Sequence, residues 1–381
     1  MTMPSPSADP RSSLRPLALT LGDPAGIGGE IIARAFLRDP PATVGCFVAG
    51  DQAHLERALA VVLRRQGRRG AAAGPSDPSG VAGAGKRLLR VIPIGSPAEA
   101  AGVDPGGIPV LQVGPRHDPE RLVAWGQVQA AAGRIAGEAV VWAARAALRG
   151  DIAGLVTAPL HKKALAAAGF PFPGHTELLQ AEAAAHLQRP VSGVPVRMML
   201  ASDALRTVLV SIHVSLRQAI EAVTFDNVLQ TLRITHQALT PVLGRPPRLA
   251  VAGLNPHAGE GGLFGREEIE IIAPAVHAAR SEGIDADGPH PPDTVFMRAR
   301  ATRQRPGAFD AVIAMYHDQG LIPVKYLGLD RGVNVTLGLP LVRTSPDHGT
   351  AFDLAGTGRA DPASLLAAIR AARQLAAPAP H

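Results

Sequence analysis

Residues 16–30 decide the fold class of this chain, and they read PLALTLGDPAGIGGE. The first six residues form an apolar run of the length of a buried strand, and a glycine-rich turn leads from it into helical sequence from about Ile31. A strand, a glycine-rich turn and a helix in this order are typical of an α/β fold. The turn lacks the G-x-G-x-x-G spacing of a dinucleotide fingerprint, so we interpret it as a tight structural turn near a ligand.

The same alternation continues along the chain. Further strands are expected at residues 44–49, 89–94 and 154–159, around Met198, and at 207–212, 249–253 and 311–315. Helices are expected at residues 120–148, 160–168, 216–239 and 267–282. This order predicts largely parallel sheets with helices on both faces. Because 381 residues exceed what one core usually holds, two domains are expected.

Two segments do not have the composition of a folded core. Residues 1–14 are polar and rich in Ser and Pro, which predicts a disordered tail that lacks the apolar centre of a secretory signal. Residues 70–85 consist almost entirely of Ala, Gly, Ser, Pro and Asp, which predicts a flexible insertion. Residues 80–86 imitate a phosphate-binding loop, but Arg87 stands where a magnesium-binding Ser or Thr is required, so we expect no nucleotide site there.

Charge and composition argue against several classes of function. The net charge is +6, yet the densest basic run, residues 64–69, has no aromatic residues interleaved for base stacking, so we expect no nucleic-acid partner. No apolar run reaches membrane-spanning length, and we expect no membrane association. The single cysteine, Cys46, excludes an intrachain disulfide and fits a reducing compartment, which predicts a cytoplasmic protein.

Four histidines follow apolar strands or lie in Gly-, Pro- and Asn-rich turns, where α/β proteins assemble their sites: His175, His213, His257 and His317. The last three follow predicted strands, whose carboxyl ends face one cleft in a parallel sheet, so together they could bind a metal ion. No H-x-x-x-H spacing links them. The alternative that each histidine orders its own loop therefore stays open.

Three side chains suited to binding anions follow His317 at equal spacing: Lys325, Asn334 and Arg343. Each alone has the features of a surface residue. Together, among glycines and after the last predicted strand, they indicate a site for a carboxylate or a phosphate, which Lys and Arg bind through charge-assisted hydrogen bonds.

Five motifs occur in order along the chain: LGDPAGIG at 21–28, GHTE at 174–177, GLNPHAGEGG at 253–262, YHDQG at 316–320 and DHGT at 347–350. This ordered set resembles the 4-hydroxythreonine-4-phosphate dehydrogenase family. The resemblance implies a two-domain α/β/α fold with mostly parallel sheets, similar to isocitrate and isopropylmalate dehydrogenases and without a Rossmann fingerprint. It also implies a cofactor-side domain of residues 15–120 and 325–381, and a domain of residues 121–324 for metal binding, substrate binding and dimerisation.

The family's activity implies oxidation of 4-phosphohydroxy-L-threonine with NAD or NADP. The product, 2-amino-3-oxo-4-(phosphooxy)butanoate, loses CO2 to give 3-amino-2-oxopropyl phosphate in pyridoxal 5'-phosphate biosynthesis. One divalent metal ion per site, Zn, Mg or Co, would polarise the hydroxyl and keto oxygen. The active sites would be shared between the subunits of a homodimer.

The resemblance assigns roles residue by residue. The expected metal ligands are His213, His257 and His317, and the expected substrate-binding residues are His175, Thr176, Lys325, Asn334 and Arg343. Asp318 and Asp293 match carboxylates near the substrate, and these two residues and Lys162 are the candidates for the catalytic base. The cofactor is expected to contact His348, Gly349 and Thr350.

Other functions remain open at this point. The same oxidative decarboxylation could act on a threonate or erythronate phosphate or on a carboxylated dihydrodiol, and extra residues at 188–196 could alter substrate access. Three histidines with an open position would also suit a zinc hydrolase, which needs no nicotinamide. A binding protein without catalytic activity would not explain why these histidines and anion-binding side chains occur together.

Overall fold

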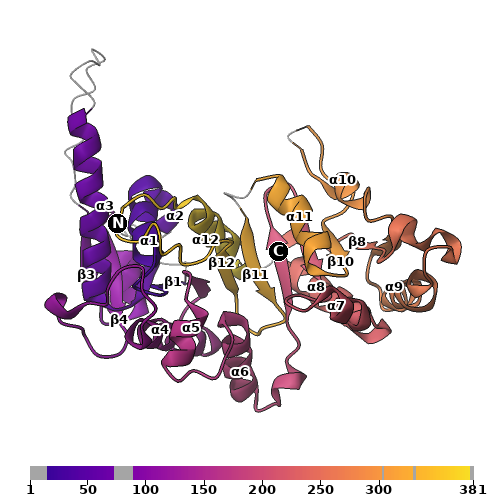
Figure 1. The fold of residues 1–381 in the computed structure, drawn as a ribbon, viewed down its shortest axis with the longest axis horizontal. Helices are drawn as coiled ribbons and strands as arrows, with labels where there is room; N and C mark the ends of the chain where they lie inside the picture. Colours follow the sequence, from indigo (N-terminus) through magenta and orange to yellow (C-terminus); the bar gives the residue numbers. More distant parts are fainter. Residues whose placement is uncertain (1–14, 73–88, 303, 329–331, 378–381) are drawn as a thin grey trace, which may run out of the picture. The chain divides into compact units, whose positions relative to one another are not determined.

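The computed structural model describes residues 15–72, 89–302, 304–328 and 332–377, and it divides into two compact units (Figure 1). Unit 1 comprises Met1–Leu187 and His348–Ala372, and unit 2 comprises Gln188–Asp347 and Arg373–His381. The expected tail and residues 73–85 of the expected insertion lie outside the described residues. Residues 70–72, expected in that insertion, instead end a helix.

Unit 1 is built on five parallel strands in the spatial order β3-β4-β2-β1-β5. The strands are β1 Leu17–Thr20, β2 Cys46–Gly50, β3 Arg90–Pro93, β4 Gly107–Gln112 and β5 Gly154–Thr157. The helices are α1 Gly28–Arg38, α2 Pro40–Thr43, α3 Gln52–Ala72, α4 Ala130–Leu148, α5 Lys162–Ala167, α6 His175–Leu187 and α12 Ala363–Ala376. Every residue of β1, β2 and β5 is buried, as expected of parallel strands covered on both faces.

Unit 2 contains seven strands in the spatial order β12-β11-β6-β7-β10-β8-β9. The strands are β6 Arg197–Ala201, β7 Arg206–Leu209, β8 Leu249–Ala252, β9 Ala286–His290, β10 Ala311–Ala314, β11 Val333–Leu337 and β12 Arg343–Pro346. The helices are α7 Leu216–Ala222, α8 Phe225–Leu243, α9 Ala273–Ser281, α10 Val295–Ala299 and α11 His317–Tyr326. Pairing is antiparallel from β12 to β7 and parallel from β7 to β9.

The core of unit 2 covers both faces of its parallel strands. Ala250 and Val312 pack in one cluster with Phe296 of α10 and Leu321 of α11. Val251 alternates with Ala250, so it points to the opposite face, and it is also fully buried. The predicted α/β class with mostly parallel pairing is therefore confirmed, although the strands from β12 to β7 depart from it.

Several predicted helices begin or break at other residues than expected. Helix α4 begins at Ala130 rather than at residue 120, because Gly126 adopts a φ of 69°, which a right-handed helix cannot continue. The helix expected at 216–239 is two helices, since Thr224 caps a new one by accepting the backbone N–H of Asn227 at 3.2 Å. The segment expected at 267–282 starts as a π-helical turn, Glu268–Ile272.

The unit boundaries also differ from the expected domain boundaries at 120/121 and 324/325. Helix α4 packs against β1, β2 and β5 and against α5 and α6, which places residues up to Leu187 in unit 1. Strand β11 pairs with β6 and with β12, which keeps residues up to Asp347 in unit 2. Among the described residues, no helix combines the length and the apolar character needed to cross a membrane.

Candidate active site

The three histidine segments predicted to bind a metal leave neighbouring parallel strands of unit 2. His213 follows β7, His257 follows β8 and His317 follows β10, and β10 pairs in parallel with both β7 and β8. Carboxyl ends of parallel strands meet at one edge of a sheet. The structure therefore brings these three segments to the same edge.

Two buried or half-buried side chains join the three segments. The Ser211 hydroxyl donates to the Met315 carbonyl oxygen at 2.9 Å, which links the His213 segment to the His317 segment. The Gln319 side chain accepts the Met315 N–H and donates to the Gly253 carbonyl oxygen, both at 2.7 Å. Gln319 thus connects the His317 segment to the residues that lead to His257.

The histidine rings differ in how closely they approach one another. The ring centroids of His213 and His317 lie 5.5 Å apart, and His317 Nδ1 lies 2.7 Å from Asp318 Oδ1. His257 is exposed and has Phe264 as a ring neighbour at 6.2 Å. Within the described part of the chain, these three histidines do not form a group whose ligand atoms all lie within 4.8 Å of one another.

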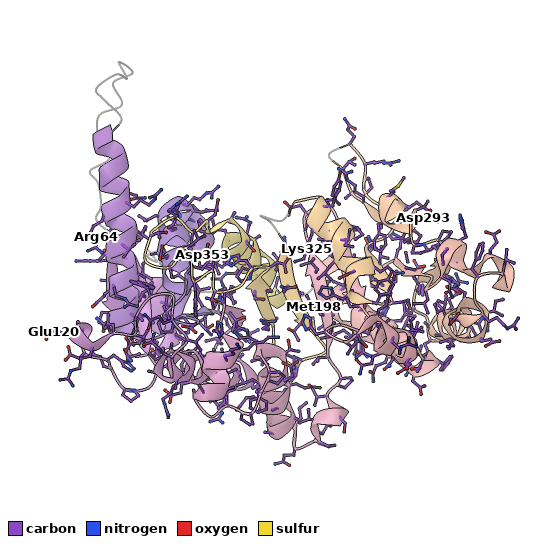
Figure 2. The ribbon with its side chains drawn as sticks, in the orientation of Figure 1. Arg64, Glu120, Met198, Asp293, Lys325 and Asp353 are labelled. Atoms are coloured by element: carbon purple, nitrogen blue, oxygen red, sulfur yellow. The ribbon has the colours of Figure 1, made fainter. Side chains whose placement is uncertain are left out.

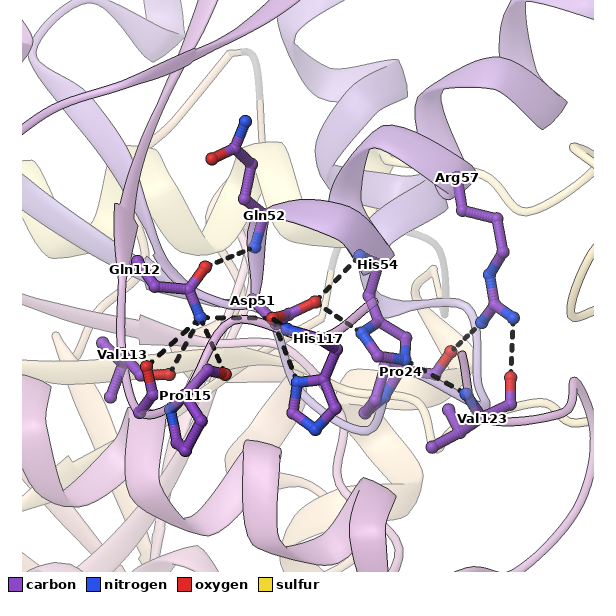
Figure 3. Close-up of polar contacts among 11 residues, drawn as sticks. Pro24, Asp51, Gln52, His54, Arg57, Gln112, Val113, Pro115, His117 and Val123 are labelled. Carbon is purple, nitrogen blue, oxygen red and sulfur yellow. Dashed lines mark hydrogen bonds and ion pairs between the residues drawn. The ribbon is translucent and has the colours of Figure 1, made fainter. Parts of the chain in front are cut away.

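The described residues contain one such group, Asp51, His54 and His117, at the carboxyl ends of β2 and β4 in unit 1 (Figure 3). Asp51 Oδ1 lies 2.6 Å from His54 Nδ1, and Asp51 Oδ2 lies 3.1 Å from His117 Nδ1. His54 Nε2 accepts the Val123 N–H at 3.2 Å, so Nδ1 must carry the proton of the neutral ring. A protonated Nδ1 cannot bind a metal ion, and the group forms a closed hydrogen-bond network instead.

Burial and hydrogen bonding set the charges in this network. Burial alone would raise the pKa of Asp51, but hydrogen bonds from the side chains and backbone N–H groups of His54 and His117 outweigh it and hold that pKa far below its usual range. Burial lowers the pKa of His54, against the opposing influence of Asp51. The network therefore combines a carboxylate with a neutral imidazole.

The three predicted anion-binding side chains all lie in unit 2, in α11, β11 and β12. Lys325 Nζ lies 2.9 Å from Asp347 Oδ2, and Asn334 donates to Asp347 Oδ1 at 3.0 Å. Arg343 is buried on β12 and donates to the Thr336 hydroxyl at 3.0 Å. The structure thus brings Lys325 and Asn334 together through Asp347.

The remaining predicted site residues lie in both units. In unit 1, Lys162 is the first residue of α5, and His175 and Thr176 are the first two residues of α6. Asp293 is exposed just before α10 of unit 2 and lies well apart from Lys325 in Figure 2. Asp293 and Lys325 are therefore not neighbours.

The predicted cofactor loop, His348 to Thr350, packs on the glycine-rich turn that opens unit 1. The Ile27 N–H donates to the Thr350 carbonyl oxygen at 3.1 Å, and a Cβ on Gly26 would lie 2.8 Å from the same oxygen. Phe352, just beyond the loop, stacks on His161 with ring centroids 5.0 Å apart. Gly26 thus allows the loop to approach the turn closely, whereas the ligand expected near this turn stays a prediction.

The sequence did not reveal the side chains that hydrogen-bond to the predicted site residues and fix their positions. Asp347 and Gln319 were visible only as members of the DHGT and YHDQG motifs, and Glu268 gave no signal of a role. Asp51 could have been found, because it directly follows the buried strand β2 and precedes His54 on the first turn of α3. Its partner His117 follows β4, a pairing that no local pattern indicates.

These features define an α/β protein in which His213, His257 and His317 follow the carboxyl ends of parallel strands. Residues 44–372 match the family model described as "Pyridoxal phosphate biosynthetic protein PdxA", and the chain belongs to that family.

Individual relatives agree with this assignment. A 4-hydroxythreonine-4-phosphate dehydrogenase of Beijerinckia indica is 50% identical over 365 residues, 96% of each chain. A D-threonate 4-phosphate dehydrogenase of Salmonella typhimurium is 43% identical over 94% of this chain and 98% of the relative. The crystal structure of a 4-hydroxythreonine-4-phosphate dehydrogenase from Klebsiella pneumoniae superposes with a TM-score of 0.79 at 40% identity, covering 96% of this chain and 99% of that one.

Proposed function

We propose that the chain oxidises 4-phosphohydroxy-L-threonine with NAD or NADP, and that the product decarboxylates to 3-amino-2-oxopropyl phosphate. The observation that carries this proposal is the 50% identity, over 96% of both chains, to a relative named for that activity. The cationic side chains of unit 2 support it, because Lys325 and Arg343 suit the phosphate and carboxylate of such a substrate. We propose a cytoplasmic location for this metabolic reaction.

The proposed metal ligands are His213, His257 and His317, which would hold one divalent ion, Zn, Mg or Co. The donor set fits Zn or Co best, because neutral imidazoles bind these ions without cancelling their charge and because His213 and His317 follow adjacent parallel strands with ring centroids 5.5 Å apart. The ion would supply Lewis-acid chemistry to the substrate oxygen. The Asp318 carboxylate 2.7 Å from His317 Nδ1 would orient that ring.

The proposed roles of the other residues follow from their chemistry. Lys325, Asn334 and Arg343, together with His175 and Thr176, would bind the substrate's polar groups, and His348, Gly349 and Thr350 would contact the cofactor. A base must accept the hydroxyl proton as hydride leaves for the nicotinamide. The candidates are Asp318, Asp293 and Lys162.

We further propose a homodimer with shared active sites. Unit 2 exposes several large apolar side chains, among them Tyr326 at 90%, Leu263 at 73% and Ile322 at 63%. Ile322 and Tyr326 lie four residues apart on α11 and therefore share one face of that helix. Large apolar side chains on one exposed face indicate a protein–protein contact.

D-threonate 4-phosphate is a second candidate substrate, because a relative at 43% identity carries the name of that activity. It differs from phosphohydroxythreonine in bearing a hydroxyl where the amino acid has an ammonium group. Both substrates therefore offer the same phosphate and carboxylate to Lys325 and Arg343. They differ only at the carbon next to the carboxylate.

Steady-state assays test the proposal. We expect reduced nicotinamide to form with 4-phosphohydroxy-L-threonine at a kcat/KM well above that for D-threonate 4-phosphate. We also expect a chelator to abolish this activity and added divalent metal ion to restore it. A higher kcat/KM for D-threonate 4-phosphate would favour the second candidate. Absence of nicotinamide reduction with either substrate would contradict both.

A further inference from the structure

The turn that carries His257 has an unusual backbone. Residues 257–261 all adopt positive φ, at 52°, 53°, 80°, 43° and 65° in order. Gly259 and Gly261 accept such values readily, whereas His257, Ala258 and Glu260 are L-residues for which left-handed backbone costs free energy. A run of this kind persists only where surrounding contacts hold it.

One buried carboxylate, that of Glu268, holds this turn. Glu268 is 2% exposed, and its Oε1 accepts the backbone N–H groups of Leu254 and Asn255, both at 2.7 Å. Its Oε2 accepts the Asn255 side-chain amide at 3.0 Å. A Cβ on Gly259 would lie 2.7 Å from the same Oε2, so the carboxylate contacts both the entry and the middle of the turn.

Glu268 is itself held in a conformation uncommon in proteins. It is the first residue of the π-helical turn Glu268–Ile272, and π-helical turns often occur at functional sites. The neighbouring Glu267 accepts the Asn255 amide at 2.7 Å, so Asn255 is fixed by two carboxylates. Both acids contact the segment before His257 and neither contacts its ring in the described interactions.

We propose that Glu268 is a positioning residue for His257: it holds residues 254–255 and so supports the left-handed turn at 257–261 that presents the imidazole for metal binding. The inference rests on the proposed metal site. A carboxylate suits this task because its oxygens can only accept hydrogen bonds, and three N–H groups converge on it. Second-layer groups of this kind set metal affinity by orienting the ligand.

Replacing Glu268 by glutamine changes one contact in a defined way. The glutamine can keep its oxygen for the two backbone N–H groups, but its amide then faces the Asn255 amide, donor against donor. Asn255 cannot relieve this by turning over, because its oxygen would then face the Glu267 carboxylate. The substitution therefore removes the hydrogen bond between Asn255 and residue 268 but preserves the volume of the side chain.

The experiment titrates ZnCl2 into the metal-free full-length protein by calorimetry, for wild type, Glu268→Gln, His257→Ala and the double variant. We expect Glu268→Gln to weaken zinc binding about ten- to hundredfold. We expect no further loss from Glu268→Gln in the His257→Ala background, because a residue that acts through His257 has no effect once His257 is absent.

Asp310→Asn is the matched control. Asp310 is also a largely buried carboxylate of unit 2, where it accepts the Arg248 N–H at 2.7 Å and pairs with Arg245 at 2.8 Å. Its replacement should lower the melting temperature without changing zinc affinity. If Glu268→Gln does not fold, Asn255→Ala carries the same test, because it removes the same contact from a half-buried position.

The outcomes separate this inference from the proposed function. Wild-type zinc affinity in folded Glu268→Gln, or an additive loss in the double variant, would overturn the positioning role and leave the metal site standing. An unchanged zinc affinity in His257→Ala would overturn the metal site and the positioning role together. Loss in both single variants without further loss in the double variant supports the inference.

Discussion

Asp347 places a negative charge among the cationic side chains proposed to bind the substrate. Its side chain is 8% exposed and pairs with Lys325 at 2.9 Å, while Asn334 donates to its other oxygen at 3.0 Å. An anionic substrate that binds Lys325 must share it with this carboxylate. Asp347 therefore opposes substrate binding through charge, even as it orders the side chains around it.

We predict that Asp347→Asn lowers KM for the phosphorylated substrate about two- to fivefold, because it removes a repulsion equivalent to up to about 1 kcal/mol. The asparagine keeps an acceptor for Asn334. Steady-state kinetics would measure the change, and Lys325→Ala should shift KM in the opposite direction. A raised KM in Asp347→Asn would instead mean that orientation of Lys325 dominates.

His54 is held neutral by its surroundings. Its Nδ1–H donates to Asp51 and its Nε2 accepts the Val123 N–H, so a second proton on Nε2 would face another donor. Burial accordingly lowers the pKa of His54 below its ordinary 6.5 in the folded chain. As the pH falls below that value, the unfolded chain binds a proton that the folded chain does not, and stability falls.

We predict that the free energy of unfolding decreases as the pH falls from about 7 to 5, and that His54→Gln makes this slope shallower by up to about 1.4 kcal/mol per pH unit. Urea unfolding at a series of pH values measures the slope. His277→Gln, at an exposed position of unit 2, is the control and should leave the slope unchanged. A His54→Gln slope equal to that of wild type would contradict the neutral, buried imidazole.

At the scale of elements, helix α4 approaches its neighbours through glycines on one face. A Cβ on Gly133 would lie 1.9 Å from the Ala164 carbonyl oxygen of α5, and one on Gly137 would lie 2.4 Å from the Phe170 ring. The two glycines are four residues apart and therefore lie on the same side of the helix. The contact between α4 and α5 thus depends on the absence of side chains.

We predict that Gly133→Ala destabilises the protein by about 1–3 kcal/mol, because the added methyl group overlaps backbone atoms that cannot rotate away. Gly67→Ala in α3 is the control. Nothing lies within 4 Å of its Cβ position, so that substitution should stabilise the helix by about 0.5–1 kcal/mol. Denaturant midpoints of the two variants should therefore move in opposite directions.

At the scale of the whole molecule, the distances between the rings of His213, His257 and His317 indicate how a dimer would divide the metal ligands between its subunits. His213 and His317 approach to 5.5 Å within one chain, whereas His257 is not part of that pair among the described contacts. A shared site would then combine His213 and His317 of one subunit with a His257 contributed by the other. Such a division can be tested by mixing variants.

We predict that co-expressed His257→Ala and His317→Ala chains recover about a quarter of wild-type activity, because half of the dimers are mixed and each mixed dimer holds one intact site. A mixture of His213→Ala with His317→Ala should recover none, since both losses fall on the same half of the site. Recovery in the second mixture would show that His213 and His317 belong to different halves, and recovery in neither would argue against sharing.

Much of the framework followed from local sequence. The strands β1, β2, β5, β8 and β10 were predictable because each is a short, fully buried apolar run. Helix α11 was not predicted, because it contains Pro323 and its apolar side chains are divided between the core and the surface. Strand β11 escaped prediction although its alternating Val-Asn-Val-Thr-Leu run is typical of a strand, and β12, Arg-Thr-Ser-Pro, carries no apolar run and is a strand through its pairing with β11.

The sequence by itself determined the α/β class, the family, and the histidine and basic residues from which a site could be built. These depend on residue identities and short-range periodicity, which a linear chain carries in full. Only the tertiary structure decided that Asp347 joins Lys325 to Asn334, that Asp51 joins His54 to His117, and that Glu268 supports the turn of His257. These partners depend on strand order and on backbone of positive φ, which arise from packing between residues distant in the chain.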